Sequence, residues 1–180
     1  MESLFATAPG FDQPLAVLKH CHDRIRRQLI TLEKLPEHLA KNGADAAAQQ
    51  AAIAVLRYFT QAAPLHHEDE EIDLLPTLQA TAGPNEQTLL AQLLPMILQQ
   101  HQEMSELWQE LQTSLEAVAE MKNQALPANA LNRFKQLYHA HMRIEEEQIA
   151  PMAARVLSTE QLQHIGTAMQ VRRGIKPQGI

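Results

Sequence analysis

The stretch LHHEDEEIDLLP, which runs from Leu65 to Pro76, places two adjacent histidines against five acidic residues. The chain of 180 residues contains nine histidines, so a pair of them among carboxylates needs an explanation. Taken alone, such an acidic run is most often the solvated face of a helix. The alternative is half of a metal site, because side chains four residues apart project from the same face of a helix.

The composition favours one helical domain. Alanine, leucine, glutamine and glutamate predominate, and glycine is scarce, with six residues, which suits helices. A chain of this length can bury its own core as a single domain. The formal net charge of −6 argues against a nucleic-acid-binding surface, which would be basic.

The expected location is the cytoplasm. The N-terminal residues lack the positive charge and the apolar core of a signal peptide. No segment approaches the roughly 18 apolar residues that a membrane span needs. The single Cys21 excludes an internal disulfide and fits a reducing compartment. We therefore expect a protein that binds neither membranes nor nucleic acid and is a monomer or a homodimer.

Apolar residues recur at helical spacing in four long segments, at about residues 13–39, 45–78, 86–123 and 128–156. A short fifth helix is expected to begin with Ser158 as its cap and to fade by Gln170. No run alternates apolar and polar residues over the length of a strand. The pattern predicts an all-α fold, an antiparallel up-down-up-down four-helix bundle with a short C-terminal helix.

The predicted domain covers residues 1–170, with a core at about 12–155, and residues 171–180 are expected to form a flexible tail. Four prolines fall within the helical patterns or near their ends. Each is expected to kink or stop its helix, because proline lacks the amide hydrogen and clashes with the preceding turn. These prolines are Pro64, Pro76, Pro95 and Pro151.

The two halves of the chain repeat one plan. His66 is followed four residues later by Glu70, as His141 is followed by Glu145. Both histidines have a phenylalanine seven residues before them and a proline ten residues after them. In each half, the helix that precedes this pair carries one histidine on its apolar face. The repeat is therefore a helix with one inward histidine, followed by a helix with His-x-x-x-Glu.

The two lone inward histidines are His22 and His101, each flanked by apolar residues at helical spacing. Four helices that each supply a side chain at similar depth predict a central cage of nitrogen and oxygen donors. Imidazole and carboxylate together suit iron, manganese or zinc. The set is too large for one zinc ion, which takes four ligands, and it suits two irons. Unpaired buried groups of this kind would destabilise the fold.

The segments CHDRI (21–25), HHEDEEIDLLP (66–76) and HMRIEEEQIAP (141–151), with a lone mid-helix histidine between the last two, resemble the hemerythrin-like, HHE cation-binding domains. The resemblance covers about residues 12–155. It implies a four-helix bundle around a non-haem di-iron centre with an oxo, hydroxo or water bridge, in which manganese or zinc are substitutes for iron. Carried over by position, the ligands are His22, His66, Glu70, His101, His141 and Glu145, with the two glutamates as bridges.

The chain departs from the oxygen-carrying hemerythrins on its third helix. Those proteins place two histidines there, four residues apart, whereas Ile97 and Ser105 occupy the positions four residues either side of His101. His67 is the nearest candidate to replace the missing ligand, and Glu68 is the next. Fewer imidazole donors would favour the ferric state, so the resemblance implies peroxide or redox chemistry rather than reversible oxygen carriage.

The register in the second helix has an alternative, because His67 and Glu71 are also four residues apart. We prefer His66 with Glu70, since their spacing to phenylalanine and proline matches the second half of the chain. Whether Glu146 shares the role of its neighbour stays open. The remaining acidic residues of the two motifs are expected to be solvated or hydrogen-bonded to the ligands; they are Glu68, Asp69, Glu71, Glu146 and Glu147.

Two functions follow as hypotheses. The first is a di-iron protein that binds or reduces a small diatomic molecule or a peroxide, such as oxygen, nitric oxide or hydrogen peroxide. Relatives of this reduced type are associated with oxidative or nitrosative stress and with iron handling. The second is an iron or oxygen sensor or store that acts through a partner protein.

Overall fold

The computed structural model describes residues 8–176, and all its regular elements are helices. The first long helix is α1 (Pro14–Asn42) and the third is α5 (Pro84–Ala119). The second comprises α2 (Ala46–Arg57), the π-helical turn η1 (Tyr58–Ala62), α3 (Ala63–Glu68), the π-helical turn η2 (Asp69–Leu74) and α4 (Leu75–Thr81). The fourth comprises α6 (Ala128–Ile144), the π-helical turn η3 (Glu145–Ile149) and α7 (Ala150–Val156). The last helix is α8 (Thr159–Arg172).

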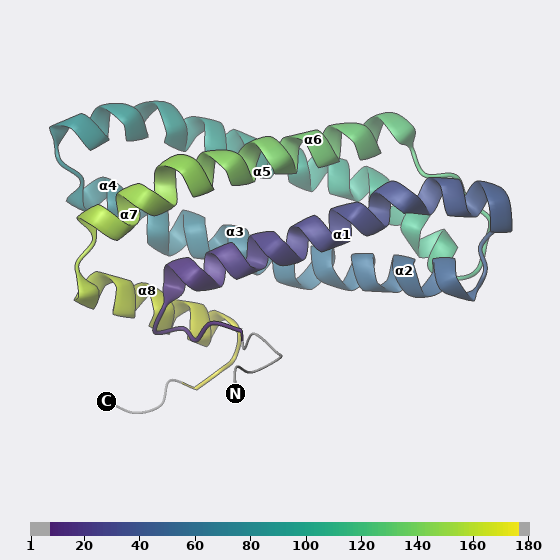
Figure 1. Cartoon of the computed structure of the whole chain (residues 1–180), viewed down its shortest axis with the longest axis horizontal. Coiled ribbons are helices and arrows are strands. Elements are labelled where there is room, and N and C mark those ends of the chain that lie inside the picture. The colour runs from purple at the N-terminus through teal and green to yellow at the C-terminus, as the bar shows by residue number, and fades with distance from the viewer. Residues whose placement is uncertain (1–7, 177–180) are drawn as a thin grey trace, which may run out of the picture.

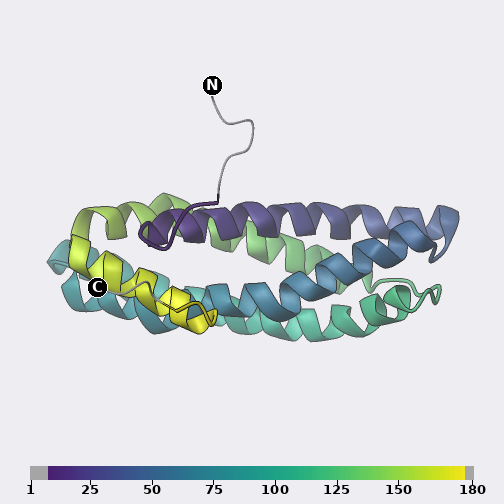
Figure 2. The same ribbon diagram turned by 90° about the horizontal axis from the view of Figure 1, so that it is seen from below.

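Figure 1 shows the four long helices running alternately in opposite directions, with α8 beside the end of the bundle where α1 begins. Seen from below in Figure 2, α8 runs beside the second long helix. The predicted antiparallel bundle with a short C-terminal helix is confirmed. Across residues 8–176, every helix is too short or too polar to cross a bilayer.

Local sequence signals set the helix ends. Gly43 follows α1 with a φ of 69°, a left-handed conformation that glycine adopts without steric cost. The Asp45 side chain accepts a hydrogen bond from the amide of Ala48 and caps α2. Ser158 caps α8 as predicted, in a reciprocal capping box with Gln161.

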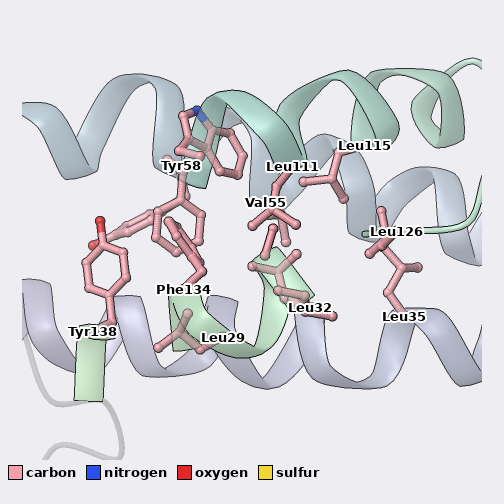
Figure 3. Close-up of a cluster of buried hydrophobic side chains, with 14 of the residues drawn as sticks. Leu29, Leu32, Leu35, Val55, Tyr58, Leu111, Leu115, Leu126, Phe134 and Tyr138 are labelled. Atoms are coloured by element: carbon pink, nitrogen blue, oxygen red, sulfur yellow. The ribbon is translucent and has the colours of Figure 1, made fainter. Parts of the chain in front are cut away.

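The apolar core is divided into two clusters with the polar layer between them. The larger lies around α2, α6 and the C-terminal half of α5, and Figure 3 shows Leu29, Val55 and Phe134 pointing into it. The smaller lies at the other end, around α4, α7 and α8. On α1, His22 lies between one residue of each cluster, Leu18 and Ile25. The predicted ligands therefore form a buried polar layer across an otherwise apolar bundle.

None of the four prolines that were expected to kink or stop a helix stops one. Pro36 and Pro95 lie inside α1 and α5, which are α-helical on both sides of them. Pro64, Pro76 and Pro151 each follow a π-helical turn, and the helix continues beyond them. A π turn bonds each amide to the carbonyl five residues back. The helix can therefore continue although proline has no amide hydrogen to donate.

Two of these π turns begin at or just before the predicted bridging glutamates. The amide of Leu75 donates to the carbonyl of Glu70, directly before Pro76. The amide of Ala150 donates to the carbonyl of Glu145 in the same way. The repeated spacing between glutamate and proline, seen in the sequence, is therefore a repeated backbone geometry at the polar layer.

The helix α8 is longer than expected, because it continues past Gln170 to Arg172. Arg173 donates to the buried carboxylate of Asp69 at 2.6 Å, and Arg172 pairs with the same carboxylate. Asp69 was expected to be solvated or bonded to a ligand; it is instead the anchor of α8. The rest of the predicted tail, residues 177–180, lies outside the described residues.

Candidate metal centre

All the predicted ligands meet in the middle of the bundle, in three overlapping groups. Within each group, one ligand atom from every residue lies within 4.8 Å of the others. The groups are His22, His66, Glu70 and Glu145; Glu70, His101, His141 and Glu145; and His67, His101 and His141. His67 is partly buried, and the other six residues are buried.

The two glutamates are common to the first two groups, which divides the centre into two subsites. We use "first subsite" for His22 and His66 with the two glutamates. We use "second subsite" for His67, His101 and His141 with the same glutamates. A carboxylate that faces two sets of imidazoles can place one oxygen toward each, which is what a bridging ligand requires.

The facing ligand atoms are close to one another. The Nε2 atom of His22 lies 3.1 Å from Oε2 of Glu145, and Nε2 of His141 lies 3.2 Å from the same oxygen. Nε2 of His66 lies 3.3 Å from Oε1 of Glu70. Glu145 therefore faces both subsites within the described structure.

Outer hydrogen bonds orient three of the imidazoles. Nδ1 of His22 lies 2.9 Å from Oε1 of Glu146, whose carboxylate also accepts two hydrogen bonds from Arg26. Nδ1 of His101 lies 2.6 Å from Oε1 of Glu71. A carboxylate at Nδ1 holds the proton there and leaves Nε2 free to bind a metal. Glu146 thus lies behind His22 and takes no part in the groups to which Glu145 belongs.

The third imidazole is oriented by an amide that the sequence did not reveal. Nδ1 of His141 lies 3.1 Å from Oε1 of Gln100. Gln100 precedes His101 in sequence but contacts the histidine of another helix. Only the packing of α5 against α6 brings these two residues together, so no pattern within either helix could have predicted the contact.

Several buried polar atoms at the centre lack hydrogen-bond partners among the described residues. They include both ring nitrogens of His66, Nε2 of His67, Oε2 of Glu70 and both carboxylate oxygens of Glu145. Each unsatisfied buried group costs about 1–3 kcal/mol. Neutral imidazoles and carboxylates are the ligands of iron, manganese and zinc, so these residues could hold metal of this kind, which would satisfy the unpaired atoms.

The ionisation of these groups reflects their burial. Burial, with a smaller contribution from neighbouring histidines, lowers the pKa of His66 and of His67 well below the ordinary value. The imidazoles of His66 and His67 therefore stay neutral, the form that binds metal. Burial and the nearby charge of Glu145 raise the pKa of Glu70 well above its ordinary range. Burial opposes ionisation of Glu145 as well, but the charges and hydrogen bonds of His141 and His22 outweigh it and lower its pKa.

The structure places His66 and Glu70 in the buried layer, whereas Glu71 is half-exposed behind His101. It places His67 beside His101 and His141, on the side of the centre where the third helix lacks a histidine. Five imidazoles and two carboxylates are therefore gathered there, and His67 is placed where it could supply the nitrogen that the third helix lacks, while the absence of reversible oxygen carriage stays a prediction. Glu68, the other candidate replacement, faces Arg172 instead.

A cavity of about 360 Å³ opens onto the first subsite between α1, η2 and the η3–α7 segment. His22, Glu70 and Glu145 line it, together with apolar side chains of α1 and α7. A small molecule can thus approach the first subsite through this cavity, whereas the cavity beside His67 of the second subsite is smaller, at about 110 Å³.

Comparison with known proteins agrees with this arrangement. The family model described as the hemerythrin HHE cation binding domain matches residues 13–153. An uncharacterized protein from Haemophilus influenzae is 34% identical over 172 residues, which cover 96% of this chain and 95% of that protein. The matched residues include both His-x-x-x-Glu motifs and both lone inward histidines. The chain therefore belongs to the hemerythrin HHE cation-binding family.

Proposed function

We propose that this protein holds two iron ions in the two subsites and binds and reduces a small oxidant, namely oxygen, nitric oxide or a peroxide. Its cellular role would be in the response to oxidative or nitrosative stress or in iron handling. The observation that carries the proposal is that Glu70 and Glu145 belong to two groups at once, one with His22 and His66 and the other with His101 and His141, which also lie close to His67. One metal ion would not need two pairs of imidazoles that each lie close to the same two carboxylates.

The residues would have distinct roles. His67, His101 and His141 would hold one ion and His22 and His66 the other, with the two glutamates bridging them. The first subsite has fewer protein donors and lines the cavity, so it supports ligand binding there. A pair of ferrous ions supplies two electrons to a bound oxidant.

The chain's own groups would control protons and water. Glu146 bonds to His22 and to Arg26 and is only partly buried, so it can pass protons between solvent and the first subsite. The two apolar clusters exclude water from both ends of the polar layer. Electrostatic interactions at such a water-poor site are stronger than they would be in solvent.

Elemental analysis of anaerobically purified protein, followed by optical spectra during exposure to oxygen, tests this proposal. We expect about two irons per chain and a change in the visible and near-ultraviolet spectrum on oxidation. One zinc per chain and no iron would reject the di-iron assignment. Two manganese ions would retain the geometry and change the chemistry.

A second candidate is an iron or oxygen sensor or store, and one contact favours it. Asp69, which anchors Arg172 and Arg173 of the C-terminal segment, directly precedes Glu70 in the turn η2. A shift of Glu70 on metal binding would therefore reach α8. Hydrogen exchange of α8 in the metal-free and iron-loaded protein separates the two functions, because a sensor requires a large difference in protection and an oxidoreductase does not.

A further inference from the structure

The cavity at the first subsite has two chemically different parts. Seven of its twelve lining residues are apolar, and four of the five polar ones belong to the metal centre or bond to it. The fifth, Lys19, is exposed and lies at the outer end. The buried end is therefore polar and metal-binding, whereas the walls between it and solvent are hydrocarbon.

The size of the cavity exceeds what the smallest oxidants need. A water molecule takes up about 30 Å³ in the liquid, and oxygen, nitric oxide and hydrogen peroxide have two non-hydrogen atoms each. The volume of about 360 Å³ is within the range of pockets that hold organic ligands. Hydrocarbon walls also favour an apolar body over water, by about 25 cal/mol for each Å² removed from solvent.

We infer that the substrate is an organic hydroperoxide with a compact apolar body, bound with its hydroperoxide group at the first subsite. This inference rests on the proposed di-iron function and narrows its substrate. Leu15 and Leu18 of α1, Leu74 of η2 and Ile149 of η3 supply the hydrocarbon surface against the organic part. Hydrogen peroxide would find the same polar end but would gain nothing from the walls.

The reaction is a two-electron reduction. The oxygen–oxygen bond of the hydroperoxide breaks and the carbon–oxygen bond remains. The two electrons would come from the ferrous ions that the two subsites would hold, one from each ion, and the two protons would come from solvent. The oxygen bonded to carbon leaves as an alcohol and the other as water, so a single turnover of reduced protein needs no further reductant.

The test uses cumene hydroperoxide and hydrogen peroxide as oxidants and cumyl alcohol as an unreactive probe of the pocket. Single-turnover oxidation of the reduced iron-loaded protein is followed by stopped-flow absorption. We expect cumene hydroperoxide to react at least about tenfold faster than hydrogen peroxide, equivalent to about 1.4 kcal/mol. Calorimetry of the oxidised protein should detect binding of cumyl alcohol, independently of turnover.

Two variants fill the cavity and leave every predicted ligand unsubstituted. Ala16→Phe on α1 and Ala154→Phe on α7 each place a ring against the apolar walls. Either should weaken cumyl alcohol binding and slow the reaction with cumene hydroperoxide by about tenfold, with iron content and the hydrogen peroxide rate unchanged. Ala91→Phe, at an exposed position of α5 that does not line the cavity, is the matched control.

The outcomes separate this inference from the proposed function. A protein without two irons, or one inert to both peroxides, overturns the proposed function. A protein with two irons that reacts equally fast with both peroxides and binds no cumyl alcohol retains that function and overturns the inference. Retention of alcohol binding in both folded cavity-filling variants also overturns it, because the bound molecule would then lie elsewhere.

Discussion

The imidazole rings of His67 and His101 lie nearly parallel, with centroids 4.0 Å apart and planes inclined by 9°. They come from different long helices, α3 and α5, yet point to the same side of the buried carboxylates. Adjacent residues of one helix, His66 and His67, therefore belong to different subsites. The fourth long helix contributes one histidine to the centre, whereas the second long helix contributes two.

Removal of the His67 ring should weaken metal binding at the second subsite selectively. His67→Ala is expected to lower the iron content below two per chain, because the second subsite loses one of its three imidazoles while the first subsite keeps all its donors. Metal analysis of anaerobically purified protein measures this. His139→Ala, an exposed histidine two residues before His141, is the control and should keep both ions. Full iron content in the His67 variant would show that this ring is not a ligand.

The register of the second helix predicts an order of severity for two double variants. His66→Ala with Glu70→Ala removes a buried donor and a shared carboxylate and should abolish metal binding. His67→Ala with Glu71→Ala removes one donor and the carboxylate behind His101, and should only weaken binding. Titration with a divalent metal after chelation ranks the two. A greater loss of metal binding in the second variant than in the first would mean that His67 and Glu71 are the ligand pair.

Metal binding should release protons. The pKa of Glu70 is raised by burial and by Glu145, and that of His22 is raised because its bonds to Glu145 outweigh burial. Both groups thus hold protons to higher pH than usual in the metal-free protein, and a metal ion must displace them. The metal affinity should therefore fall as the pH is lowered.

Calorimetric titration with zinc or manganese in buffers of different ionisation enthalpy counts these protons. Glu70→Gln keeps the shape of the side chain but has no proton to lose, so this variant should release fewer. A heat of binding that is independent of the buffer in the unaltered protein would contradict the pKa directions of both groups.

The metal-free protein should also lose stability in acid because of His66. Its pKa is lowered by burial, so the folded chain takes up no proton there, whereas the unfolded chain does so below about pH 6.5. Stability from this group is complete above that pH and is lost as the pH falls below it. Urea unfolding of metal-free protein at pH 7.5 and 5.5 measures the loss, and His66→Gln should reduce it.

Removal of the anchor of α8 should destabilise the whole bundle. Asp69→Ala leaves Arg172 and Arg173 without the buried carboxylate that they share. Loss of one partner of such a pair costs about 3 kcal/mol. Urea unfolding should show this difference, whereas Asp23→Ala, which removes an exposed carboxylate on α1, should change the free energy of unfolding little. Equal stability of both variants would mean that α8 contributes nothing through these pairs.

The fold was predictable because its signals are local. Periodicity placed the four long helices to within a few residues, and Ser158 marked the start of the last one. The buried positions of His22, His101 and His141 followed from their place on the apolar faces.

The features that the sequence did not reveal depend on packing between distant segments. Arg172 meets Asp69 across 103 residues, and Gln100 meets His141 across 41. His67 was open to two interpretations because periodicity within one helix cannot say which neighbouring helix a partly buried side chain faces. Pro64, Pro76 and Pro151 were misjudged because no local pattern indicated the π turn that precedes each of them and lets the helix continue.

The π turns also determine where the backbone can open locally. In α1 and α5 the histidines lie on regular α-helical turns, whereas η2 and η3 replace the usual ladder of amide bonds at Glu70 and Glu145. Amide hydrogen exchange near these two glutamates should therefore be faster than at the same depth in α1 and α5. The lone histidines would then lie on rigid backbone and the two glutamates on backbone that opens more readily. The carboxylates could therefore change their distance from each other while the lone histidines stay in place.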